Sequence, residues 1–385
     1  MLYLFSYKHK GSDNVKKVIT ACLAAIILFS TACSTGVTAS AKSIQGNKGM
    51  TLDCARLFYS PKLLRGYINT LSKNNAKFLL LHLTDNERFG VENKYLGQTT
   101  KKAKLKNGIY YNRKTHLAFL SKGQLRSLIK YAQKKHVELI PEIDLPGHNK
   151  GILKLLSYTK AGRRLKKQLV YRDGYHEFKL SKKGTLTLSK RILSEYLPLL
   201  PKGNHIGVGS DEISLDNKTE ENNFVKYINS IDSLVNRSGH KLTAWNDSFH
   251  KRTINKYRKN ITIFYWSQNG QQVDPADRRH LVKLRATLPQ LVNHGFKVVN
   301  CNYFYLYIIN RPKMYTFPSR FHWKELLNNW NERIWDDNNT SNIYKGNKKI
   351  DSALCIWSVQ HEKYSAKKSY QLSQEYLNAF LNHKD

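Results

Sequence analysis

The sequence predicts one closed α/β barrel of eight parallel strands and eight helices, a (β/α)8 TIM barrel. First, eight short apolar or β-branched runs alternate with longer amphipathic stretches along the chain. Second, acidic and aromatic side chains follow the ends of these runs, where barrels of this class carry their chemistry. Third, 41% of the 385 residues are hydrophobic, and no linker or repeat divides residues 48–385, so we expect a single domain there.

Hydrophobic periodicity and end signals place the elements in order. The runs expected as strands are 51–55, 78–83, 137–143, 205–209, 242–245, 261–266, 296–301 and 353–357. The stretches expected as helices include 61–73, 121–135, 188–200, 222–235 and 289–293. The first of these begins with Ser60-Pro61, an N-cap residue followed by proline at the first helical position.

The segment 311–347 is long and rich in aromatic residues and Asn. We expect it to be a loop excursion that covers the barrel mouth. Its Trp323, Trp330 and Trp335 could be core anchors or platforms for a sugar, and the core interpretation is preferred.

The first 41 residues have the pattern of a secretory signal peptide. Four lysines precede an apolar stretch at 18–29, and small residues follow up to Ala41. We expect cleavage after Ala41 and a secreted or cell-surface protein. A lipoprotein anchor at Cys33 competes, but Ser30 stands where such a signal normally carries Leu. An uncleaved N-terminal anchor is a further alternative.

Cysteine usage favours neither a disulfide nor a metal site. Without the leader three cysteines remain, Cys54, Cys301 and Cys355, all within apolar runs, so we expect buried free thiols. No Cys-x-x-Cys or His-Glu-x-x-His spacing occurs, so no zinc site is expected, and no cofactor is expected either.

The net charge is +36, and because residues 1–41 contain four Lys and one Asp, the remainder carries +33. Such a field attracts polyanions. The basic residues are spread along the chain without a nucleic-acid-binding motif, so we expect no nucleic-acid partner. An electrostatic association with an anionic cell envelope is one interpretation, and a merely soluble surface is the other.

The candidate site consists of side chains that follow the expected strands. Acidic, aromatic and Arg side chains at several strand ends form a pocket with charged groups and apolar walls, as a carbohydrate site requires. In chain order they are Asp53, Arg56, His82, Asp85, Glu142, Asp144, His148, Asp211, Glu212, Trp245, Asp247, Trp266, Tyr305, Tyr307 and Trp357.

Asp211 and Glu212 are the most informative pair. Neighbouring side chains of a strand point to opposite faces, so these two carboxylates can act together only where the strand has ended. Adjacent acids suggest glycoside hydrolysis, but a retaining pair must face each other across the scissile bond. The spacing fits better a mechanism with one acid and a nucleophile supplied by the substrate.

Several motifs resemble those of glycoside hydrolase family 20, and within it the dispersin group of β-1,6-N-acetylglucosaminidases. They occur in the family's order, and the similarity extends from about residue 50 to the last helix. The motifs are Leu-Asp-Cys-Ala-Arg-Leu-Phe-Tyr-Ser (52–60), His-Leu-Thr-Asp-Asn-Glu (82–87), Pro-Glu-Ile-Asp-Leu-Pro-Gly-His (141–148), Gly-Ser-Asp-Glu (209–212) and Trp-Asn-Asp (245–247).

The resemblance implies substrate-assisted retention, in which the 2-acetamido carbonyl of the sugar attacks C1. It implies that Glu212 protonates the leaving oxygen and later activates water, while Asp211 holds the acetamido N–H. It also implies that Arg56 binds sugar hydroxyls and that Trp245, Trp266 and Trp357 wall an acetyl pocket. A phenol from Tyr305 or Tyr307 would orient the acetamido oxygen. The residues implied to support these groups are Asp85, Glu142, Asp144 and His148. Asp247 completes the expected substrate-binding set.

The chain departs from the family pattern at four positions. Gly207 stands where the family usually has His, Ser210 where it has Gly, Leu215 where the dispersin group has Tyr, and Val359 where that group has a sugar-binding Glu. We expect a β-N-acetylhexosaminidase acting on N-acetylglucosamine-containing glycans, with poly-β-1,6-N-acetylglucosamine as the preferred substrate. A hexosaminidase for another N-acetylhexosaminide and a catalytically weak carbohydrate-binding relative are the alternatives.

Overall fold

A computed structural model describes residues 46–170, 176–270, 272, 274–316, 319–359 and 363–383. The expected signal peptide, residues 1–41, and the alternative lipid anchor at Cys33 lie outside the described residues. No helix within the described part of the chain is long and apolar enough to cross a membrane.

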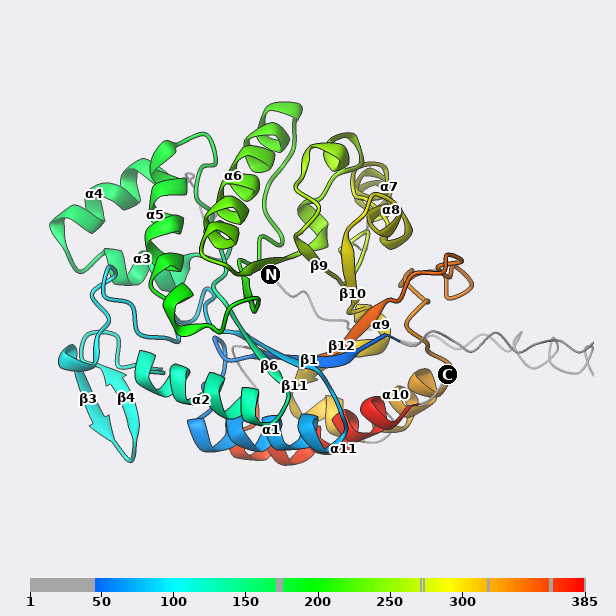
Figure 1. Cartoon of the computed structure of the whole chain (residues 1–385), viewed down its shortest axis with the longest axis horizontal. Helices are drawn as coiled ribbons and strands as arrows, with labels where there is room; N and C mark the ends of the chain where they lie inside the picture. Colours follow the sequence, from blue (N-terminus) through cyan, green and yellow to red (C-terminus); the bar gives the residue numbers. More distant parts are fainter. Residues whose placement is uncertain are drawn as a thin grey trace, which may run out of the picture. The chain divides into compact units, whose positions relative to one another are not determined.

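Eight parallel strands close into a barrel, which confirms the (β/α)8 prediction (Figure 1). Neighbouring strands pair in the order β1-β2-β6-β7-β8-β9-β10-β12, and β12 pairs with β1 to close the ring. Each of the eight expected runs overlaps one of these strands, and β1, β8 and β12 begin before the expected residue. The barrel strands are β1 (Lys48–Asp53), β2 (Phe78–His82), β6 (Glu138–Glu142), β7 (His205–Gly207), β8 (Lys241–Trp245), β9 (Thr262–Tyr265), β10 (Lys297–Asn300) and β12 (Asp351–Ser358).

The wall between β10 and β12 is split. The pairing of β10 with β12 is limited to the first residues of β12, for example Asn300 opposite Ser352. The one-turn helix α9 (Tyr303–Leu306) follows β10, and the chain then returns as β11 (Tyr307–Asn310), which pairs with the end of β12. The sequence did not predict this interruption, which brings Tyr307 to the mouth.

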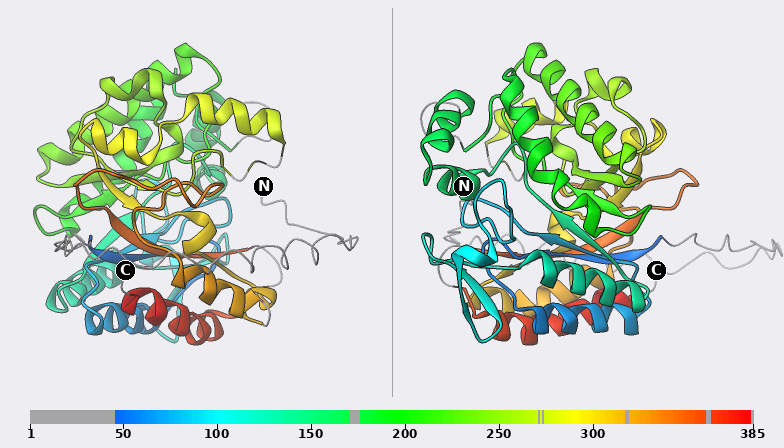
Figure 2. Two further views of the ribbon diagram at one scale, coloured as in Figure 1. Left: turned by 90° about the vertical axis from the view of Figure 1, so that its right-hand side faces the viewer. Right: turned by 60° about the vertical axis from the view of Figure 1, so that its left-hand side comes forward.

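Helices surround the barrel (Figure 2), and α1, α2 and α8 begin within one residue of the expected position. Helix α1 has the expected bounds, and the side chain of its N-cap Ser60 accepts a hydrogen bond from Leu63 N. The helices are α1 (Pro61–Lys73), α2 (Lys122–Lys134), α3 (Lys150–Leu156), α4 (Lys160–Leu169), α5 (Lys183–Ser194), α6 (Lys218–Arg237), α7 (Pro275–Leu284), α8 (Leu288–Asn293), α9, α10 (Ser319–Asn328) and α11 (Ala366–Asn382). Short 3-10 helices are η1 (Thr100–Lys102), η2 (Leu197–Leu199), η3 (Asn246–Ser248), η4 (Lys251–Lys256) and η5 (Pro312–Tyr315).

A small antiparallel sheet lies in the excursion between β2 and α2 and was not predicted. Its strands are β3 (Ala103–Lys106), β4 (Ile109–Asn112) and β5 (Ala118–Phe119). The turn between β3 and β4 is Asn107-Gly108, with φ of 50° and 75°. Two left-handed residues in a two-residue connection suit the right-handed twist of a hairpin.

The expectation of a loop at 311–347 is wrong for the helical part of that segment. It contains η5 and α10, and the Trp323 ring packs 4.6 Å from the Tyr376 ring of α11. Trp323 and Trp330 are buried, so they are core anchors. The later part does reach the strand ends, where Asn300 Nδ2 donates to the backbone oxygens of Glu332 and Ile334.

Two apolar clusters form the core. The larger lies between the strands and the helices, and the smaller fills the barrel interior, because strand side chains alternate between the two faces. The interior cluster includes Trp245 and Trp266 at the carboxyl ends of β8 and β9, which places aromatic rings under the mouth. Cys54, Cys301 and Cys355 are buried free thiols, as expected.

Candidate active site

The acid pair lies in a sharply turned loop that follows β7. Gly209, Ser210 and Glu212 have φ of 59°, 66° and 50°. This left-handed region is uncommon for residues other than glycine. Only glycine fits at 209, since a Cβ there would lie 2.2 Å from Asp144 Oδ1. The chain thus leaves strand geometry before Asp211, and the two adjacent carboxyl groups reach one pocket.

Two hydroxyl groups hold this loop against its neighbours. Ser210 Oγ donates to Leu145 O at 2.8 Å, and Ser248 Oγ donates to Ser210 O at 2.5 Å. These bonds connect the loops that follow β6, β7 and β8. The serine that replaces the family's glycine at 210 therefore has a structural role.

His148 joins the two acids. Its Nε2 lies 3.6 Å from Asp211 Oδ2 and 3.5 Å from Glu212 Oε2. The Asp211 side chain is 19% exposed and the Glu212 side chain 49%. Glu212 can therefore exchange protons at the mouth, while Asp211 lies deeper in the site.

Burial raises the pKa of Asp211 to about 7, because a charged carboxylate loses solvation. His148 opposes this rise, and the nearby carboxylates of Asp247, Glu212 and Glu142 add to it. Asp211 Oδ1 is buried and has no hydrogen-bond partner in the structure. The carboxyl group thus has an unused acceptor position inside the site.

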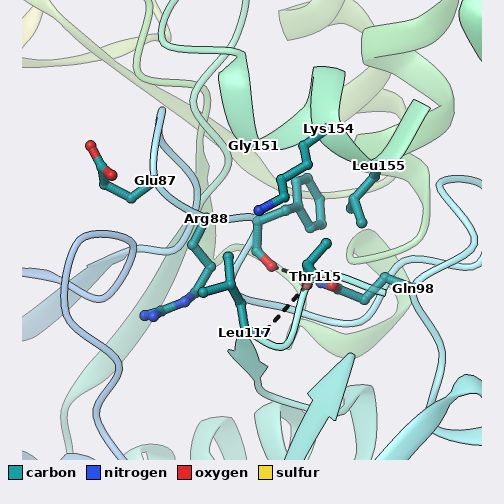
Figure 3. Close-up of a pocket in the computed structure, with 9 residues that line it drawn as sticks. Glu87, Arg88, Gln98, Thr115, Leu117, Gly151, Lys154 and Leu155 are labelled. Atoms are coloured by element: carbon teal, nitrogen blue, oxygen red, sulfur yellow. Dashed lines mark hydrogen bonds between the residues drawn. The ribbon is translucent and has the colours of Figure 1, made fainter. Parts of the chain in front are cut away.

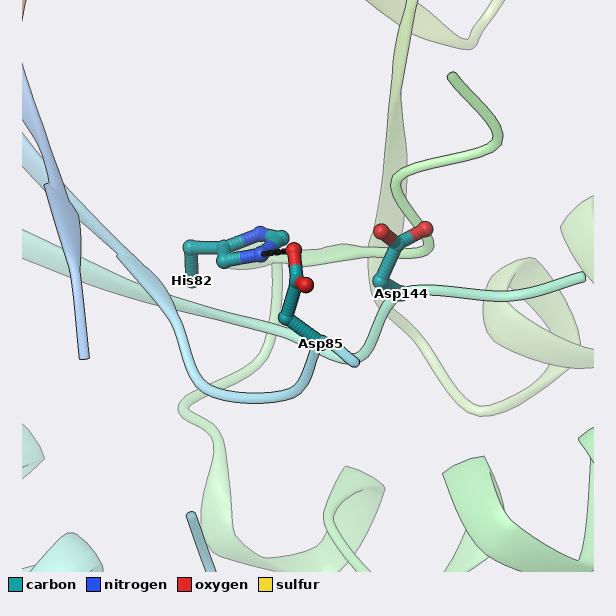
Figure 4. A group of neighbouring side chains, drawn as sticks. All are labelled: His82, Asp85 and Asp144. Atoms are coloured by element: carbon teal, nitrogen blue, oxygen red, sulfur yellow. Dashed lines mark hydrogen bonds and ion pairs between the residues drawn. The ribbon is translucent and has the colours of Figure 1, made fainter. Parts of the chain in front are cut away.

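Asp144 lies behind the acid pair and is fully buried. Neither of its carboxyl oxygens has a hydrogen-bond partner in the structure, and burial raises its pKa well above the usual range. It lies across from His82 and Asp85 in Figure 4, and one polar atom of each of these three residues lies within 4.8 Å of the others. Such a group is close enough to hold a cation, although His82 already supplies positive charge.

Arg56 and His82 link the carboxylates on the other side of the site. Arg56 Nη1 lies 3.1 Å from Asp53 Oδ2, and its Nη2 lies 2.7 Å from Asp85 Oδ2. His82 Nε2 lies 3.0 Å from Asp85 Oδ2, and Nδ1 lies 2.7 Å from Glu142 Oε1. The result is a continuous chain of alternating charge across the ends of β1, β2 and β6.

This network of alternating charges fixes the protonation states of Asp85 and His82. Burial opposes ionisation of Asp85, but Arg56 and the His82 hydrogen bond hold the pKa of Asp85 well below its usual range. Burial likewise opposes the charged form of His82, yet its bonds to Asp85 and Glu142 raise the pKa of the imidazole well above its usual value. Arg56 remains 18% exposed, so its guanidinium can contact a ligand.

Four aromatic rings form a box beside the acids. Tyr307 stacks on Trp266 with centroids 6.3 Å apart, and it lies 5.7 Å from Trp357. Trp357 lies 5.8 Å from Trp245, and the Arg56 guanidinium lies 5.7 Å from the Trp357 ring. The indole nitrogen of Trp245 is buried and has no hydrogen-bond partner among the described residues. The box is therefore largely apolar with an unused donor at Trp245.

The catalytic-domain model of glycosyl hydrolase family 20 matches residues 47–367. The chain belongs to this family. A β-hexosaminidase from Vibrio furnissii is 26% identical over 248 residues, which are 57% of this chain and 39% of that protein. One from Porphyromonas gingivalis is 22% identical over 224 residues, 52% of this chain and 28% of that protein. The chain thus spans less than half the length of these two relatives.

Solved structures of the family have the same fold. Dispersin B is 30% identical with a TM-score of 0.81, over 88% of this chain and 98% of that chain. A structure of pneumococcal StrH, described as acting in N-glycan recognition and hydrolysis, is 18% identical with a TM-score of 0.65, over 88% of this chain and 83% of that chain. At that identity StrH supports the fold alone.

The structure brings most of the predicted residues into this family 20 site, but Tyr305 packs away from it, and Asp247 is held there by protein groups. Tyr307 belongs to the aromatic box, and burial raises its pKa, with a contribution from the charge of Asp211. Tyr305 packs instead in the outer core, where its backbone oxygen accepts from Trp323 Nε1. Asp247 does not point freely into the pocket either, because it is engaged by protein groups.

Asp247 supports the acid loop. Its Oδ2 accepts from Glu212 N at 2.7 Å, and its Oδ1 accepts from Trp266 Nε1 at 3.3 Å. Arg285 Nη2 lies 3.5 Å from Asp247 Oδ2. Asn246, beside it, accepts from Trp266 N at 2.8 Å. The role expected of Asp247 was substrate binding, but its contacts are those of a positioning residue.

Two further departures from the family pattern, Gly207 and Leu215, have local explanations, and nothing in the structure explains Val359. At Gly207 a Cβ would lie 2.8 Å from Glu142 Cγ, so the stem of Glu142 occupies that space. Leu215 is buried in the outer core. Ser358, just before Val359, donates its backbone N–H to Asp53 Oδ2 at 3.0 Å, which connects β12 to the Arg56 side of the site.

Sequence reasoning missed Tyr303 and Arg285. The Tyr303 ring lies 6.2 Å from that of Trp266 and 6.3 Å from that of Tyr307, so it borders the aromatic box. The only sign of Tyr303 in the sequence was its position two residues before Tyr305. Which of these tyrosines faces the box depends on the short helix α9. No local pattern marked Arg285, which lies far from Asp247 in sequence.

A small cavity outside the acid pair and the aromatic box is lined by the residues drawn in Figure 3. It lies between the loop after β2 and α3, and its volume is ≈ 10 Å³, which suits about one water molecule. Arg88, Thr115 and Lys154 are among the side chains that line it. The acid pair and the aromatic box therefore remain the candidate active site.

Proposed function

We propose that the protein is a retaining β-N-acetylhexosaminidase that hydrolyses β-linked N-acetylglucosamine with help from the substrate's own acetamido group. The observation that carries this proposal is the acid pair: Glu212 is half-exposed, Asp211 is partly buried and has one buried oxygen without a partner, and an aromatic box lies beside them. Family membership supports the same reaction class.

In the first step the acetamido oxygen attacks C1, the bond from C1 to the leaving oxygen breaks, and Glu212 gives its proton to that oxygen. The product is a cyclic oxazolinium ion. In the second step Glu212 takes a proton from water, the water attacks C1, and the ring opens with net retention. Asp211 and Glu212 are sequence neighbours near one imidazole, so they are poorly placed to face each other across a scissile bond.

Asp211 is suited to hold the acetamido N–H through its unused oxygen. A pKa of about 7 leaves it partly protonated in the empty site at neutral pH. The developing positive charge of the oxazolinium favours the ionised carboxylate, so the interaction becomes stronger as the transition state forms. The rings of Trp245, Trp266 and Trp357 would wall the acetyl group, and Tyr307 would orient its oxygen.

The mechanism can be tested with a thiazoline analogue of N-acetylglucosamine, which resembles the cyclic intermediate. It should inhibit strongly, because transition-state-like ligands bind more tightly than substrates. A simple N-acetylglucosaminide without the fused thiazoline ring is the matched control ligand. Failure of the thiazoline to compete with a chromogenic N-acetylglucosaminide would contradict substrate assistance.

Poly-β-1,6-N-acetylglucosamine is the substrate that we propose, which would make the protein act on biofilm matrix. Similarity to Dispersin B over nearly the whole of that chain supports this choice. Val359 and Leu215 replace residues of the dispersin pattern and favour the alternative of another N-acetylhexosaminide. Product analysis on β-1,6 and β-1,4 oligomers of N-acetylglucosamine separates the two, and slow turnover of both would favour the weak, carbohydrate-binding relative.

We also propose that the protein is secreted and associates electrostatically with an anionic cell envelope. The leader-like residues 1–41 and a charge of +33 in the remainder support this. Association with isolated envelopes should fall steeply between low salt and about 0.15 M salt, where exposed charges are screened beyond ~8 Å. Binding that persists at high salt would indicate a lipid anchor at Cys33 or an uncleaved leader.

A further inference from the structure

A stretch of the chain without acidic residues forms one side of the molecule. Between Glu92 and Glu138 there are twelve Lys and Arg and no Asp or Glu. This stretch builds the β3-β4-β5 sheet and α2, and α1 beside it also lacks acidic residues. Helices α1 and α2 lie next to each other on the outside of the barrel (Figure 1).

A groove of ≈ 430 Å³ runs along these two helices, and we name it the α1–α2 groove. No acidic side chain of the described residues lines it. The residues that line it are Arg65, Gly123, Arg126, Ser127, Lys130, Tyr131 and Lys134.

The α2 side of the groove carries a row of cations. Arg126, Lys130 and Lys134 are four residues apart, so they share one face and stand about 6 Å apart along the helix axis. All three are exposed, and none forms an ion pair with a carboxylate of the described residues. Like charges one turn apart repel and lower helix stability, so the fold alone does not explain the row.

Arg65 faces this row from α1 in a fixed orientation. Its guanidinium lies 4.8 Å from the Tyr131 ring, and its Nη2 donates to Ser127 Oγ at 3.0 Å. Tyr131 OH in turn donates to Asn69 Oδ1 at 2.6 Å. A guanidinium held in place by stacking and a hydrogen bond loses little freedom when it binds an anion.

We propose that the α1–α2 groove binds a linear polyol-phosphate polymer of the cell wall. A single row of cations opposite an oriented guanidinium complements one flexible phosphodiester chain. This proposal rests on the envelope association proposed above and is independent of the glycosidase activity. The catalytic residues are at the carboxyl ends of the strands, whereas the groove lies on the outer helices, so a docked polymer would leave the mouth open.

Other anionic partners fit the groove less well. Single-stranded nucleic acid is usually bound with aromatic stacking platforms, but the one aromatic ring here is already used by Arg65. Membrane binding normally adds exposed apolar or aromatic side chains. The exposed large apolar residues of the described chain are Tyr95, Leu105, Val282, Phe304 and Ile343, and none of them lines the groove.

The test compares two triple variants with equal loss of charge. The groove variant is Arg126→Gln, Lys130→Gln and Lys134→Gln. The control variant is Lys226→Gln, Arg279→Gln and Lys283→Gln, which are exposed residues of α6 and α7. Binding of the full-length protein to synthetic poly(glycerol phosphate) is measured by titration over a range of salt concentrations. Circular dichroism and hydrolysis of a small neutral N-acetylglucosaminide should be unchanged in both variants.

The groove variant should lose about tenfold or more in affinity at low salt, and its slope of log affinity against log salt should become shallower by about 2, as expected for three lost phosphate contacts. The control variant should lose less than about threefold. Equal losses in the two variants would overturn the groove assignment in favour of diffuse charge.

Three competing probes identify the partner. Wild-type protein should prefer poly(glycerol phosphate) to oligothymidylate, duplex DNA and phosphatidylglycerol vesicles, and a preference for any of these would overturn the assigned partner. If wild-type protein binds envelopes but not poly(glycerol phosphate), the envelope association is retained and the assignment of the polymer is overturned. If it binds neither, the envelope association itself fails.

Discussion

The two sides of the active site differ in how completely their charges are paired. On one side, Arg56 and His82 connect the carboxylates of Asp53, Asp85 and Glu142 to a cation. On the side of the acid pair, Asp144, which follows β6, and one oxygen of Asp211, which follows β7, are buried without a partner among the described residues. Buried polar groups are normally satisfied in native proteins. The paired side therefore stabilises the fold and presents Arg56, whereas the unpaired side retains interactions that a bound sugar can complete.

The largest effect should come from the unpaired side. Glu212→Gln keeps the shape of the side chain but removes its transferable proton, so kcat should fall by at least about a hundred- to ten-thousand-fold. Folding and sugar binding should be nearly unchanged. Single-turnover assays with a chromogenic N-acetylglucosaminide measure this, and an unchanged kcat in a folded variant would remove Glu212 from the mechanism.

Breaking the paired side should reduce stability more than any other single change in the site. Asp85→Asn leaves the buried positive charges of Arg56 and His82 without their shared carboxylate. Loss of one partner of a buried pair typically costs about 3 to 5 kcal/mol. Denaturant unfolding monitored by fluorescence measures this cost. Asp216→Asn, which changes an exposed aspartate, is the matched control, and equal stabilities of the two variants would contradict the described network.

Asp211→Asn should change stability in the opposite direction, and only at higher pH. The folded-state pKa of Asp211 is about 7, above the value near 4 of an unfolded chain, so its ionisation costs stability above pH 7 and costs nothing below about pH 4. The variant should therefore melt several degrees above the wild type at pH 8, and the gap should close as the pH falls to 4. Thermal melts across this range measure the gap, and a constant difference would contradict the raised pKa.

The same variant should lower kcat more than it raises KM.

The smallest expected effect distinguishes two tyrosines that sequence reasoning could not separate. Tyr307→Phe keeps the ring in the aromatic box but removes its hydroxyl group. Turnover should fall by about tenfold, in keeping with the loss of one hydrogen bond. Tyr305→Phe is the matched control and should retain wild-type turnover, because its side chain packs in the outer core. Reversed effects would assign the orienting phenol to Tyr305 instead.

The sequence was sufficient to predict the barrel because its signals are local and repeated. Buried parallel strands are short continuous apolar runs, and helix α1 begins at a Ser-Pro pair that fixes its first turn. The hairpin of β3 and β4 also had a signal in Asn107-Gly108, but its strands are too polar to suggest a buried strand. Helix α4 was missed because only two of its residues are buried and most of the others are basic or polar.

The composition of the site was predictable, but the contacts within it were not. Strand-end position indicated that Asp211, Glu212 and Arg56 would meet. It could not indicate that Asp247 would support the loop through Glu212 N, because that depends on how the loops after β7 and β8 pack. The choice between Tyr305 and Tyr307 depends on the single helical turn of α9 and on the start of β11, neither of which the sequence predicted.

The split wall between β10 and β12 makes part of the binding pocket modular. The segment of residues 301–310 supplies Tyr303 and Tyr307 to the aromatic box, yet the barrel closes through β10, β12 and β1 without it. A graft of these ten residues from a relative would exchange one side of the aromatic box while the hydrogen bonds of the eight barrel strands stay in place. Evolution and protein engineering can thus adjust recognition here without rebuilding the scaffold.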